Sequence, residues 1–462
     1  MDFFKTRYFV HDFSAKEENA MKRFVSLLVS AVLLMLLLTG CAENTSLSPS
    51  DPVTVTLWHV YGEQADSPMN RLVEEFNSSV GLEKGIVVSV TNVTGSSKIS
   101  GQLEAAIAGT PGALEIPDLF SCHTNTAVVI GADKLVDWND FFTKEELSDF
   151  VPEFIEDGTK DEKFVVFPVS KSTYALFING SQFERFSADT GVNYDMLSTW
   201  EGFFDAAQKY YEWSGGKTFC ALDYLIRHVE LDVLAKGDEL EYTQNGWYDL
   251  ESESVKESFM MFANAIAKGH IAVSDLYANT QVMTGEALSG IGSTAAIGYY
   301  NDEVTYPDNT KESTNLQVLP LPRSGEGTQY MPQTGVGLAA YYKNERKAEA
   351  AAEFIKWFTQ GERNLDFVVS TGYMPVNNAA FDAIENYDFD SQGYLNLYSA
   401  IRQMREEYIP VVRPDFDGYY DKVNELYDGI RGMQAELSQR SDSGEDVSVL
   451  ANEIWELFSS IR

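Results

Sequence analysis

Aromatic side chains that follow a predicted strand or lie in a turn are the first candidates for binding chemistry in this chain. Trp58 and Tyr61 end or follow the alternating stretch VTVTLW, and Tyr373 lies in the glycine- and proline-bounded turn STGYMPV. Such rings pack against the apolar C–H surface of a sugar, so the pattern is typical of carbohydrate recognition. Core packing is the alternative for every ring, since the chain has 7 Trp, 24 Tyr and 28 Phe. The candidate rings are Trp58, Tyr61, Trp247, Tyr299, Tyr300 and Tyr373.

Hydroxyl, imidazole and guanidinium groups in the same regions are candidates for hydrogen bonds to a ligand. Ser96 and Ser97 precede a predicted helix, where unpaired amides can meet a ligand oxygen; alternatively, one of them is the N-cap of that helix. His123 ends a predicted strand, and its alternative role is that of a satisfied strand-end histidine. Arg413 either pairs with Asp415 on the surface or binds an anionic group through two nitrogens. The polar candidates are Ser96, Ser97, His123, Thr124, Ser172, Thr173, Arg413 and the backbone amide of Gly335.

Alternating strands and helices are predicted to position these residues in the first part of the chain. A helix is expected to begin at Pro68, capped by Ser67, and to end at Gly81. Strands separated by helices of this length predict parallel βαβ units, in which ligands bind beyond the carboxyl ends of the strands. The predicted strands are residues 53–58, 86–90 and 117–123, and a second helix contains Ile99, Leu103 and Ile107.

Amphipathic helices dominate the rest of the chain. Two Ser-x-x-Glu capping boxes each predict the start of a helix. The first is formed by Ser198 and Glu201, and the second by Ser254 and Glu257. Two further helices are predicted over residues 347–361 and 448–462. No internal repeat of 20 to 50 residues is visible.

Length, composition and charge limit the class of protein. A chain of 462 residues exceeds what one core supports, so we expect two lobes. Its 44% hydrophobic content indicates a well-packed globular protein. The net charge of −36 repels phosphate backbones and anionic lipid headgroups, which argues against nucleic-acid binding.

The N-terminal segment has the pattern of an export signal. Lys22 and Arg23 precede a short apolar run, which ends in LTGC at Cys41. This ending resembles the bacterial lipobox, which implies cleavage before Cys41, lipidation of its sulfur and anchoring to the outer face of the cytoplasmic membrane. An ordinary signal peptide is the alternative. We expect translation to start at Met21 and residues 42–51 to be a tether.

Cysteine and histidine usage predicts neither a disulfide scaffold nor a metal site. Cys122 and Cys220 are the two cysteines after residue 41, and we favour two separate buried thiols over one disulfide. The five histidines show no metal-binding spacing. No cofactor is expected.

Taken in order, several motifs resemble the family 1 extracellular solute-binding proteins of bacterial ABC importers. The motifs are the lipobox, TLWHVYGE…MNRLVEEFN (56–77), IPDLF (116–120), FPVSKSTYALFIN (167–179), TWEGFFDAAQKY (199–210), PQTGVGLAAY (332–341) and AAEFIKWFTQGERNLDFVVSTGYMPV (351–376). The resemblance implies an α/β fold of two lobes that close on a solute and present it to a membrane permease. It places the N-terminal lobe at 52–168 plus 296–338 and the C-terminal lobe at 172–292 plus 342–462. We expect a monomer without catalytic activity.

Comparison with the glycerol-3-phosphate-binding member of that family suggests ligand positions by motif order. The stretch PDFDGYYDKVNELYDGI (414–430) differs from the maltose-binding members, so fine specificity does not transfer. A carbohydrate is the preferred solute, a phosphorylated polyol such as glycerol 3-phosphate is the alternative, and a secreted glycoside hydrolase is a remote alternative. The positions implied by the comparison are Ser96 or Ser97, Thr124, Ser172, Ser293, Gly335, Tyr373 and Arg413.

The stretch VVFPVSKSTYALFING (165–180) predicts a crossing between the lobes. Its two apolar halves are expected to join different sheets, and Pro168 marks the point where ladder pairing stops. Ser172 is then a ligand contact in the crossing. Lys171 is either a spacer that faces solvent or a group that favours an anionic solute.

Overall fold

The computed structural model describes residues 46–61, 67–92, 96–243, 246–274, 277–414, 416 and 418–461. Residues Ser48–Arg462 form one compact unit, to which the following description refers. Among the described residues, no helix combines the length and apolar character needed to cross a membrane. The predicted signal segment, Met21 and Cys41 lie outside the described residues.

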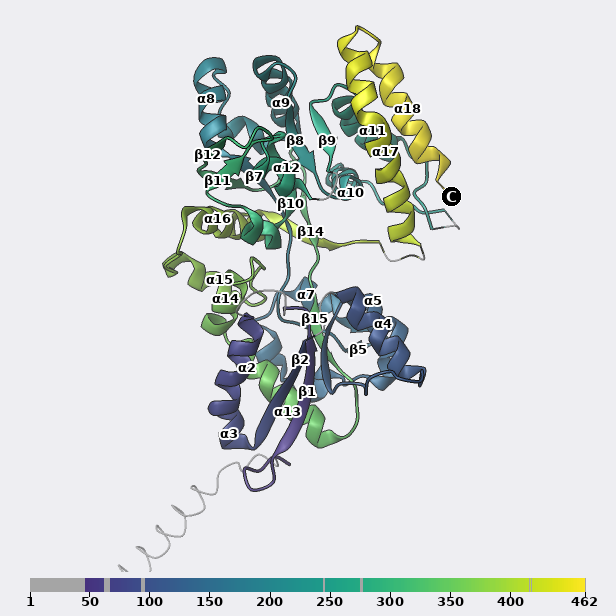
Figure 1. Cartoon of the computed structure of the whole chain (residues 1–462). Helices are drawn as coiled ribbons and strands as arrows, with labels where there is room; N and C mark the ends of the chain where they lie inside the picture. Colours follow the sequence, from purple (N-terminus) through teal and green to yellow (C-terminus); the bar gives the residue numbers. More distant parts are fainter. Residues whose placement is uncertain are drawn as a thin grey trace, which may run out of the picture. The chain divides into compact units, whose positions relative to one another are not determined.

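The first sheet has five strands in the order β2-β1-β3-β15-β6. Figure 1 labels β1, β2 and β15 of this sheet. The first three strands along the chain run parallel, as the βαβ pattern predicts, and β15 runs antiparallel to β3 and β6. The carboxyl ends of β1 and β3 therefore meet the amino end of β15 at one edge. The strands are β1 (Val53–His59), β2 (Ile86–Asn92), β3 (Leu119–Cys122), β6 (Phe167–Pro168) and β15 (Gly337–Ala340).

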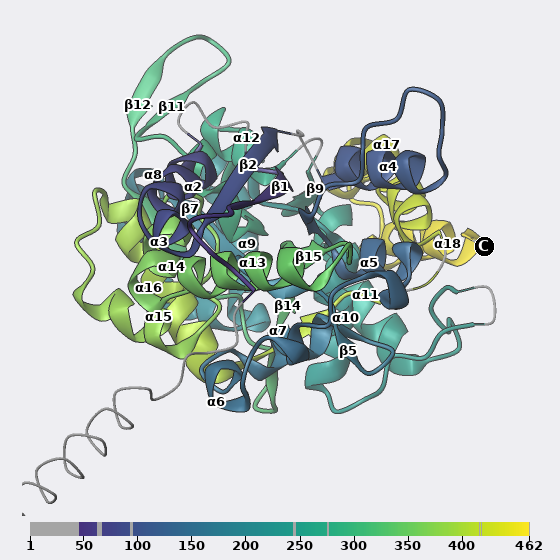
Figure 2. The same cartoon turned by 90° about the horizontal axis from the view of Figure 1, so that it is seen from below.

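Helices connect and cover this first sheet. Helix α2 begins at Pro68, and the Ser67 side chain accepts a hydrogen bond from the Asn70 amide, as predicted. It ends at Ser78 rather than at Gly81, because a short helix, α3, follows and ends at left-handed Gly85. Helix α13 packs against β1 (Figure 2). The helices are α2 (Pro68–Ser78), α3 (Val80–Lys84), α4 (Ser96–Ile107), α5 (Thr124–Ile130) and α13 (Glu345–Phe358).

The second sheet also has five strands, in the order β13-β7-β10-β8-β9. Strands β10, β8 and β9 run parallel, whereas β7 is antiparallel to both β10 and β13. Its strands are β7 (Tyr174–Asn179), β8 (Thr218–Leu222), β9 (Ile271–Val273), β10 (Ala287–Ser293) and β13 (Leu316–Leu319). The helices around it include α8 (Gly180–Thr190), α9 (Trp200–Ser214), α10 (Leu225–Ala235), α11 (Glu253–Ala267), α12 (Ala278–Met283), α17 (Tyr419–Asp442) and α18 (Val447–Ser460).

Both predicted capping boxes are displaced from the true helix starts. Thr199 caps α9 by accepting from the Gly202 amide, while the Ser198 hydroxyl donates to the Asp195 carbonyl. Ser252 caps α11, so Ser254 lies inside the helix. A cap requires extended backbone at the capping residue, which the spacing of Ser and Glu does not reveal.

Two segments depart from the lobe boundaries expected from the resemblance. Strand β13 lies within the stretch 296–338 but pairs with β7 in the second sheet. Helix α13 lies within the stretch 342–462 but packs against β1 of the first sheet. The reason is connectivity: after β10 the chain remains with the second sheet through β13 and rejoins the first sheet at β15.

The predicted crossing lies between the two sheets. Strand β6 ends at Pro168 on the edge of the first sheet, and β7 begins the contribution to the second sheet at Tyr174, as predicted. Ser172 forms an isolated bridge with Thr334, and Lys171 forms one with Met374. A second connection is the parallel pair β14 (Gln329–Gln333) and β16 (Tyr408–Val412).

The remaining elements are short or peripheral. The hairpin β11–β12 projects from the body of the molecule (Figure 2). The remaining helices are α6 (Lys144–Leu147), α7 (Pro152–Asp157), α14 (Gly361–Val369), α15 (Asn378–Ala383) and α16 (Gln392–Glu407). The remaining strands are β4 (Thr159–Lys160), β5 (Lys163–Phe164), β11 (Glu303–Thr305) and β12 (Lys311–Ser313). Short 3-10 turns occur at Ala132–Lys134, Trp138–Asp140, Tyr194–Ser198, Thr294–Tyr299 and Ile384–Asn386.

Candidate functional site

A cavity of about 710 Å³ lies at the strand ends of both sheets. Val60 and His123 follow β1 and β3 on one side, and Asp223 follows β8 while Ser293 ends β10 on the other. Ligand sites of α/β sheets occupy this position, because side chains beyond the carboxyl ends of parallel strands converge there. The volume lies within the range of about 300 to 1,000 Å³ that is usual for small-molecule pockets.

The crossing supplies the polar groups in the middle of the cavity. Ser172 and Thr334 exchange two backbone hydrogen bonds, each 3.0 Å long. Gly335 follows at φ 98°, and a Cβ there would lie 2.8 Å from the Ser170 carbonyl oxygen. Only glycine therefore permits this close approach of the two chain segments. Ser172, Thr334, Gly335 and Tyr373 line the cavity.

His123 is fixed by a hydrogen bond to the same segment. Its Nδ1 lies 2.9 Å from the Gly335 carbonyl oxygen, which can only accept, so Nδ1 carries the proton. Burial, with a further contribution from Lys171, lowers the pKa of His123. A neutral ring with a protonated Nδ1 leaves Nε2 as a hydrogen-bond acceptor for a ligand hydroxyl.

Lys171 lies behind the cavity floor and does not face solvent. Only 4% of its side chain is exposed, and its Nζ lies 2.7 Å from Oδ2 of Asp157. Burial raises the pKa of Asp157, but the charge and hydrogen bond of Lys171 outweigh it, so the pKa lies below its ordinary value. The expectation of a solvent-facing spacer is therefore wrong, because the buried carboxylate of Asp157 holds the ammonium group.

Tyrosines form most of the aromatic surface of the cavity. Tyr174 and Tyr224 stack, with ring centroids 5.6 Å apart and an interplanar angle of 17°. Tyr224 adopts a left-handed conformation at φ 52°, which is unusual for a bulky residue and is found where a site imposes it. The tyrosines that line the cavity are Tyr174, Tyr224, Tyr277, Tyr373, Tyr419, Tyr420 and Tyr427.

One face of helix α17 forms a wall of the cavity. Tyr420, Asn424, Tyr427 and Arg431 follow helical spacing and share that face. The Tyr427 hydroxyl accepts a hydrogen bond from the Ile226 amide at 3.0 Å, which fixes α17 against α10. These residues were missed from the sequence. The available signal was that the segment 414–430 differs from the maltose-binding members.

A buried ionic network supports this wall. Arg227 lines the cavity and pairs with Glu230, and its Nη2 donates to the Val411 carbonyl at 3.0 Å. The Tyr248 hydroxyl donates to the second oxygen of Glu230. The network joins α10 to the end of β16 and so fixes the position from which α17 starts.

Asp223 is the second carboxylate of the cavity. The Ser274 hydroxyl donates to its Oδ1, and the Ala278 amide donates to the same oxygen at 3.0 Å. Burial nevertheless outweighs these hydrogen bonds and raises the pKa of Asp223 to about 6.

Arg413 enters the cavity from the end of β16. Its guanidinium carbon lies 4.6 Å from the ring centroid of Tyr420 and 5.4 Å from that of Tyr419. Its Nη1 donates to the Pro414 carbonyl at 3.1 Å. Asp415, the surface partner considered from the sequence, lies outside the described residues.

About half of the candidates predicted from the sequence line this cavity. Ser96 and Ser97 open helix α4, but their side chains lie outside the described residues. The candidates that line the cavity are His123, Thr124, Ser172, Ser293, Gly335, Tyr373 and Arg413.

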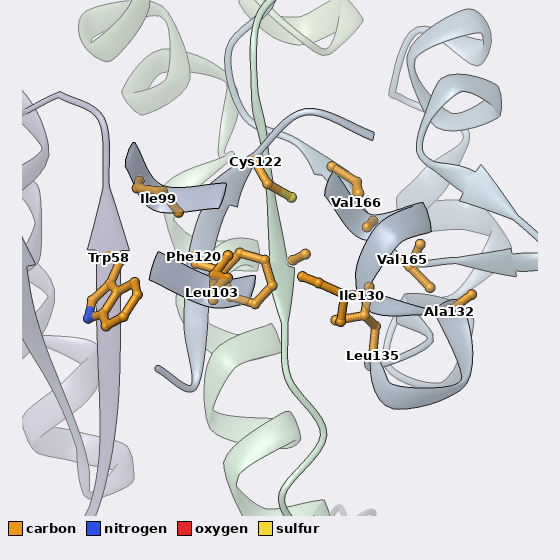
Figure 3. Close-up of a cluster of buried hydrophobic side chains, with 12 residues drawn as sticks. Trp58, Ile99, Leu103, Phe120, Cys122, Ile130, Ala132, Leu135, Val165 and Val166 are labelled. Carbon is orange, nitrogen blue, oxygen red and sulfur yellow. The ribbon is translucent and has the colours of Figure 1, made fainter. Parts of the chain in front are cut away.

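The remaining described candidates lie elsewhere. Trp58 is 3% exposed and packs with Leu103 and Phe120, because helix α4 covers its face of β1 (Figure 3). Trp247 is also in the core, where its Nε1 donates to the Phe458 carbonyl at 3.4 Å. Tyr299 is exposed and does not line the cavity.

Three further candidates are buried beside the cavity. The Tyr61 hydroxyl lies 2.6 Å from the Ser170 hydroxyl, and its ring contacts that of Tyr373 edge-on. Thr173 is fully buried, and its backbone pairs with Thr294. Tyr300 stacks on Phe177. These residues position the cavity wall and do not themselves line it.

The described part of the chain contains no arrangement of side chains suited to metal or thiol chemistry. No group of three or more His, Cys, Asp or Glu side chains there is placed to hold a metal ion. Cys122 and Cys220 are both free and buried, and burial raises the pKa of each thiol to about 12.

The sequence profile of the family described as bacterial extracellular solute-binding protein matches residues 71–390, which is well over half of the chain. The chain belongs to this family. As an extracellular solute-binding protein, it is exported. The family and the relatives described next are binding proteins.

Two curated relatives show which solutes similar proteins bind. This solute-binding protein is 23% identical over 352 residues to the sn-glycerol-3-phosphate-binding periplasmic protein of Rhizobium meliloti strain 1021, covering 72% of this chain and 77% of that protein. It is 21% identical over 439 residues to the arabinooligosaccharide-binding protein of Bacillus subtilis strain 168, covering 91% of this chain and 98% of that protein.

Solved structures show the same two-sheet fold. The cyclic α-maltosyl-1,6-maltose binding protein of Arthrobacter globiformis matches with a TM-score of 0.65 at 17% identity. The match covers 89% of this solute-binding protein and 99% of that chain. The fold is therefore that of the periplasmic binding proteins, as the sequence motifs indicated.

Proposed function

We propose that this solute-binding protein captures a carbohydrate in the cavity and delivers it to the permease of an ABC importer, without catalysing a reaction. The cavity itself is the observation that supports this best. It combines a wall of tyrosine rings, which suits the C–H faces of a sugar, with hydroxyl, imidazole and amide groups that suit its hydroxyls. The arabinooligosaccharide- and maltose-type relatives support the same class of solute.

A phosphorylated polyol is the second candidate. The relative that binds sn-glycerol 3-phosphate supports it, and so does the presence of Arg413 in the cavity. A phosphate dianion, however, is best held by several converging donors, and Arg227 in this cavity is already paired with Glu230. The carbohydrate therefore remains the preferred solute.

Binding is tested by thermal unfolding of the chain from residue 42 onward, which contains the compact unit Ser48–Arg462. At 100 times its Kd, a true ligand stabilises the native state by about 2.7 kcal/mol. We expect this stabilisation with one class of oligosaccharide and no release of reducing ends. Stabilisation by glycerol 3-phosphate but by no sugar would replace the carbohydrate proposal, and turnover of a glycan would contradict the assignment as a binder.

We also propose that Cys41 carries the lipid anchor and that the two sheets belong to two lobes. The first lobe would comprise residues 52–168 and 335–384, and the second 174–330 and 392–461, following the strand pairing above and, for residues 361–384, the bridge between Phe150 and Asn377. A ligand would then favour the closed arrangement by its higher affinity for that state. Substitution of Cys41 by Ala is expected to release the protein from membranes into the medium, as measured by fractionation of cells expressing the full chain.

A further inference from the structure

The cavity is basic, although the protein is strongly acidic. Four cationic side chains line it against two carboxylates. When the ion-pair partners Lys171, Glu230 and Asp428 are included, five positive groups stand against four negative ones, which leaves a formal charge of +1 in a chain of net charge −36. Such a local reversal of sign attracts anions to the cavity while the rest of the surface repels them. The cationic side chains are Lys160, Arg227, Arg413 and Arg431, and the carboxylates are Asp157 and Asp223.

Both carboxylates of the cavity are already engaged by the protein. Asp157 is neutralised by Lys171 at 2.7 Å. Asp223 accepts hydrogen bonds from Ser274 and from the Ala278 amide. Neither carboxylate therefore requires a cationic ligand, and neither is placed in an ion pair with an arginine of the cavity wall in the described structure.

The arginines differ from one another in whether they are already paired. Arg227 is paired with buried Glu230, and Arg431 with Asp428. Arg413, in contrast, forms no ion pair with any carboxylate among the described residues, and the same is true of Lys160. Arg413 is held instead by the rings of Tyr419 and Tyr420, so its guanidinium is positioned while no carboxylate of the described residues forms an ion pair with it.

The combination of a positioned guanidinium and tyrosine rings defines a ligand chemistry. A guanidinium binds a carboxylate through two parallel hydrogen bonds, and adjacent rings pack on the sugar that carries it. An arginine without an ion pair to any described carboxylate matches a monoanionic carboxylate better than a phosphate dianion. Tyr419 and Tyr420 belong to the stretch 414–430, which directly follows Arg413 in the chain.

We propose that the solute is an acidic sugar, a uronic acid or an oligosaccharide containing one, whose carboxylate binds Arg413 beside Tyr420. This inference rests on the proposed carbohydrate function and names its substrate class. Lys160, at the end of β4, also lines the cavity and contributes long-range attraction.

Calorimetric titration with matched ligand pairs tests the proposal. The ligands are oligomers of galacturonic, glucuronic and mannuronic acid, their carboxyl-reduced neutral counterparts, arabinooligosaccharide and glycerol 3-phosphate. We expect at least one uronide to bind more than tenfold more tightly than its reduced counterpart, and its Kd to rise with added salt as screening increases.

Variants of Arg413 assign the preference to one side chain. Substituting Arg413→Gln should weaken the uronide about 10- to 100-fold and leave the reduced counterpart within about threefold. Arg413→Lys should be intermediate, because it retains the charge and loses the planar fork. The control is Arg402→Gln, a surface arginine of α16 that pairs with Glu385 and Glu406 and should change neither affinity.

The outcomes separate the two proposals. If neutral sugars bind and no uronide binds better than its reduced form, the acidic-sugar proposal is overturned while the carbohydrate function stands. If glycerol 3-phosphate alone binds, or no sugar binds, the proposed carbohydrate function is itself contradicted, and the acidic-sugar proposal falls with it. If a uronide is preferred but Arg413→Gln weakens both members of the pair equally, the assignment of the carboxylate to Arg413 is overturned.

Discussion

Lys171, in the crossing between the two sheets, forms a buried ion pair with Asp157 at the end of α7, with 2.7 Å between Nζ and Oδ2. The lysine side chain is 4% exposed and the aspartate side chain 17%. The pair fixes the crossing to the helix that borders the first sheet, and it neutralises a carboxylate that lines the cavity. From the sequence, the ammonium group of Lys171 was a candidate for favouring an anionic ligand. In the structure it is paired with Asp157 inside the protein instead.

Removing the lysine is expected to be strongly destabilising. Lys171→Met leaves the buried carboxylate of Asp157 without its partner, which costs about 3 to 5 kcal/mol in comparable buried pairs. Urea unfolding, followed by circular dichroism, measures the loss. The double variant Lys171→Met with Asp157→Asn should recover part of it, because no unpaired charge remains.

An exposed pair provides the matched control for this substitution. Lys311 and Glu303 lie 2.5 Å apart on the projecting hairpin, with side chains 59% and 47% exposed. Lys311→Met should change stability by less than about 1 kcal/mol. Equal losses in both lysine variants would show that burial of the Lys171 pair has no special energetic role.

Asp223 is expected to make stability depend on pH between 4 and 7. Its pKa is about 6 in the folded protein and about 3.8 when unperturbed, so the folded state binds the proton more tightly. The stability from this protonated carboxyl is fully present below the unfolded value and is lost as pH rises through 6. The loss from pH 4 to pH 7 is about 2 kcal/mol.

The comparison variant for Asp223 is Asp223→Asn, which retains an oxygen for Ser274 and the Ala278 amide but does not titrate. The difference in free energy of unfolding between the natural protein and this variant should change by about 2 kcal/mol across the interval. An unchanged difference from pH 4 to pH 7 would contradict the raised pKa.

Gly335 is expected to tolerate no side chain. Alanine there would adopt a left-handed φ of 98° and place its Cβ 2.8 Å from the Ser170 carbonyl oxygen. Strain of this kind costs about 1 to 3 kcal/mol, and the displaced carbonyl of Gly335 would also release His123. Unfolding and ligand titration should therefore both show a loss for Gly335→Ala.

Gly101, in contrast, is expected to tolerate a side chain. It lies in helix α4, and a Cβ there would meet nothing within 4 Å. Gly101→Ala should stabilise the protein by about 0.5 to 1 kcal/mol, because alanine loses less backbone entropy in a helix. If both alanine variants were stabilising, the close approach at Gly335 would not be a constraint in solution.

Substitution of Trp58 is expected to reduce stability, whereas substitution of Tyr420 is expected to reduce ligand affinity. Trp58 is 3% exposed in a hydrophobic cluster, so Trp58→Ala should cost about 3 to 5 kcal/mol of stability. Tyr420 is 51% exposed on the cavity wall, so Tyr420→Ala should leave the unfolding transition nearly unchanged and weaken ligand binding by about tenfold. A folded Trp58→Ala variant with normal stability and weak binding would contradict this division.

Local sequence patterns predicted much of the fold because they depend on neighbouring residues. Proline at the first position of α2 and Ser67 before it specify that helix start directly. Pro168, followed by a polar stretch between two apolar halves, likewise predicted that β6 stops there and that β7 belongs to another sheet. In contrast, the starts of α9 and α11 were misplaced, because several Ser and Thr residues compete there and only the folded backbone selects the cap.

Part of the candidate site was also predictable from local sequence patterns. His123, Thr124 and Ser172 follow strands or fill the crossing, and parallel strands bring such positions to one edge. Trp58 has the same sequence signal, yet its side chain points to the face that α4 covers. Period-two alternation identifies two faces of a strand without showing which face another element covers.

The sequence by itself thus determined the alternation of strands and helices, the change of sheet at Pro168 and the family, since each depends on local spacing or on ordered motifs. Tertiary structure decided that α17 forms a cavity wall, that Lys171 is paired with Asp157 and that Arg413 lies over tyrosine rings. Those contacts join residues of different elements, and they depend on packing between elements, which no local pattern records.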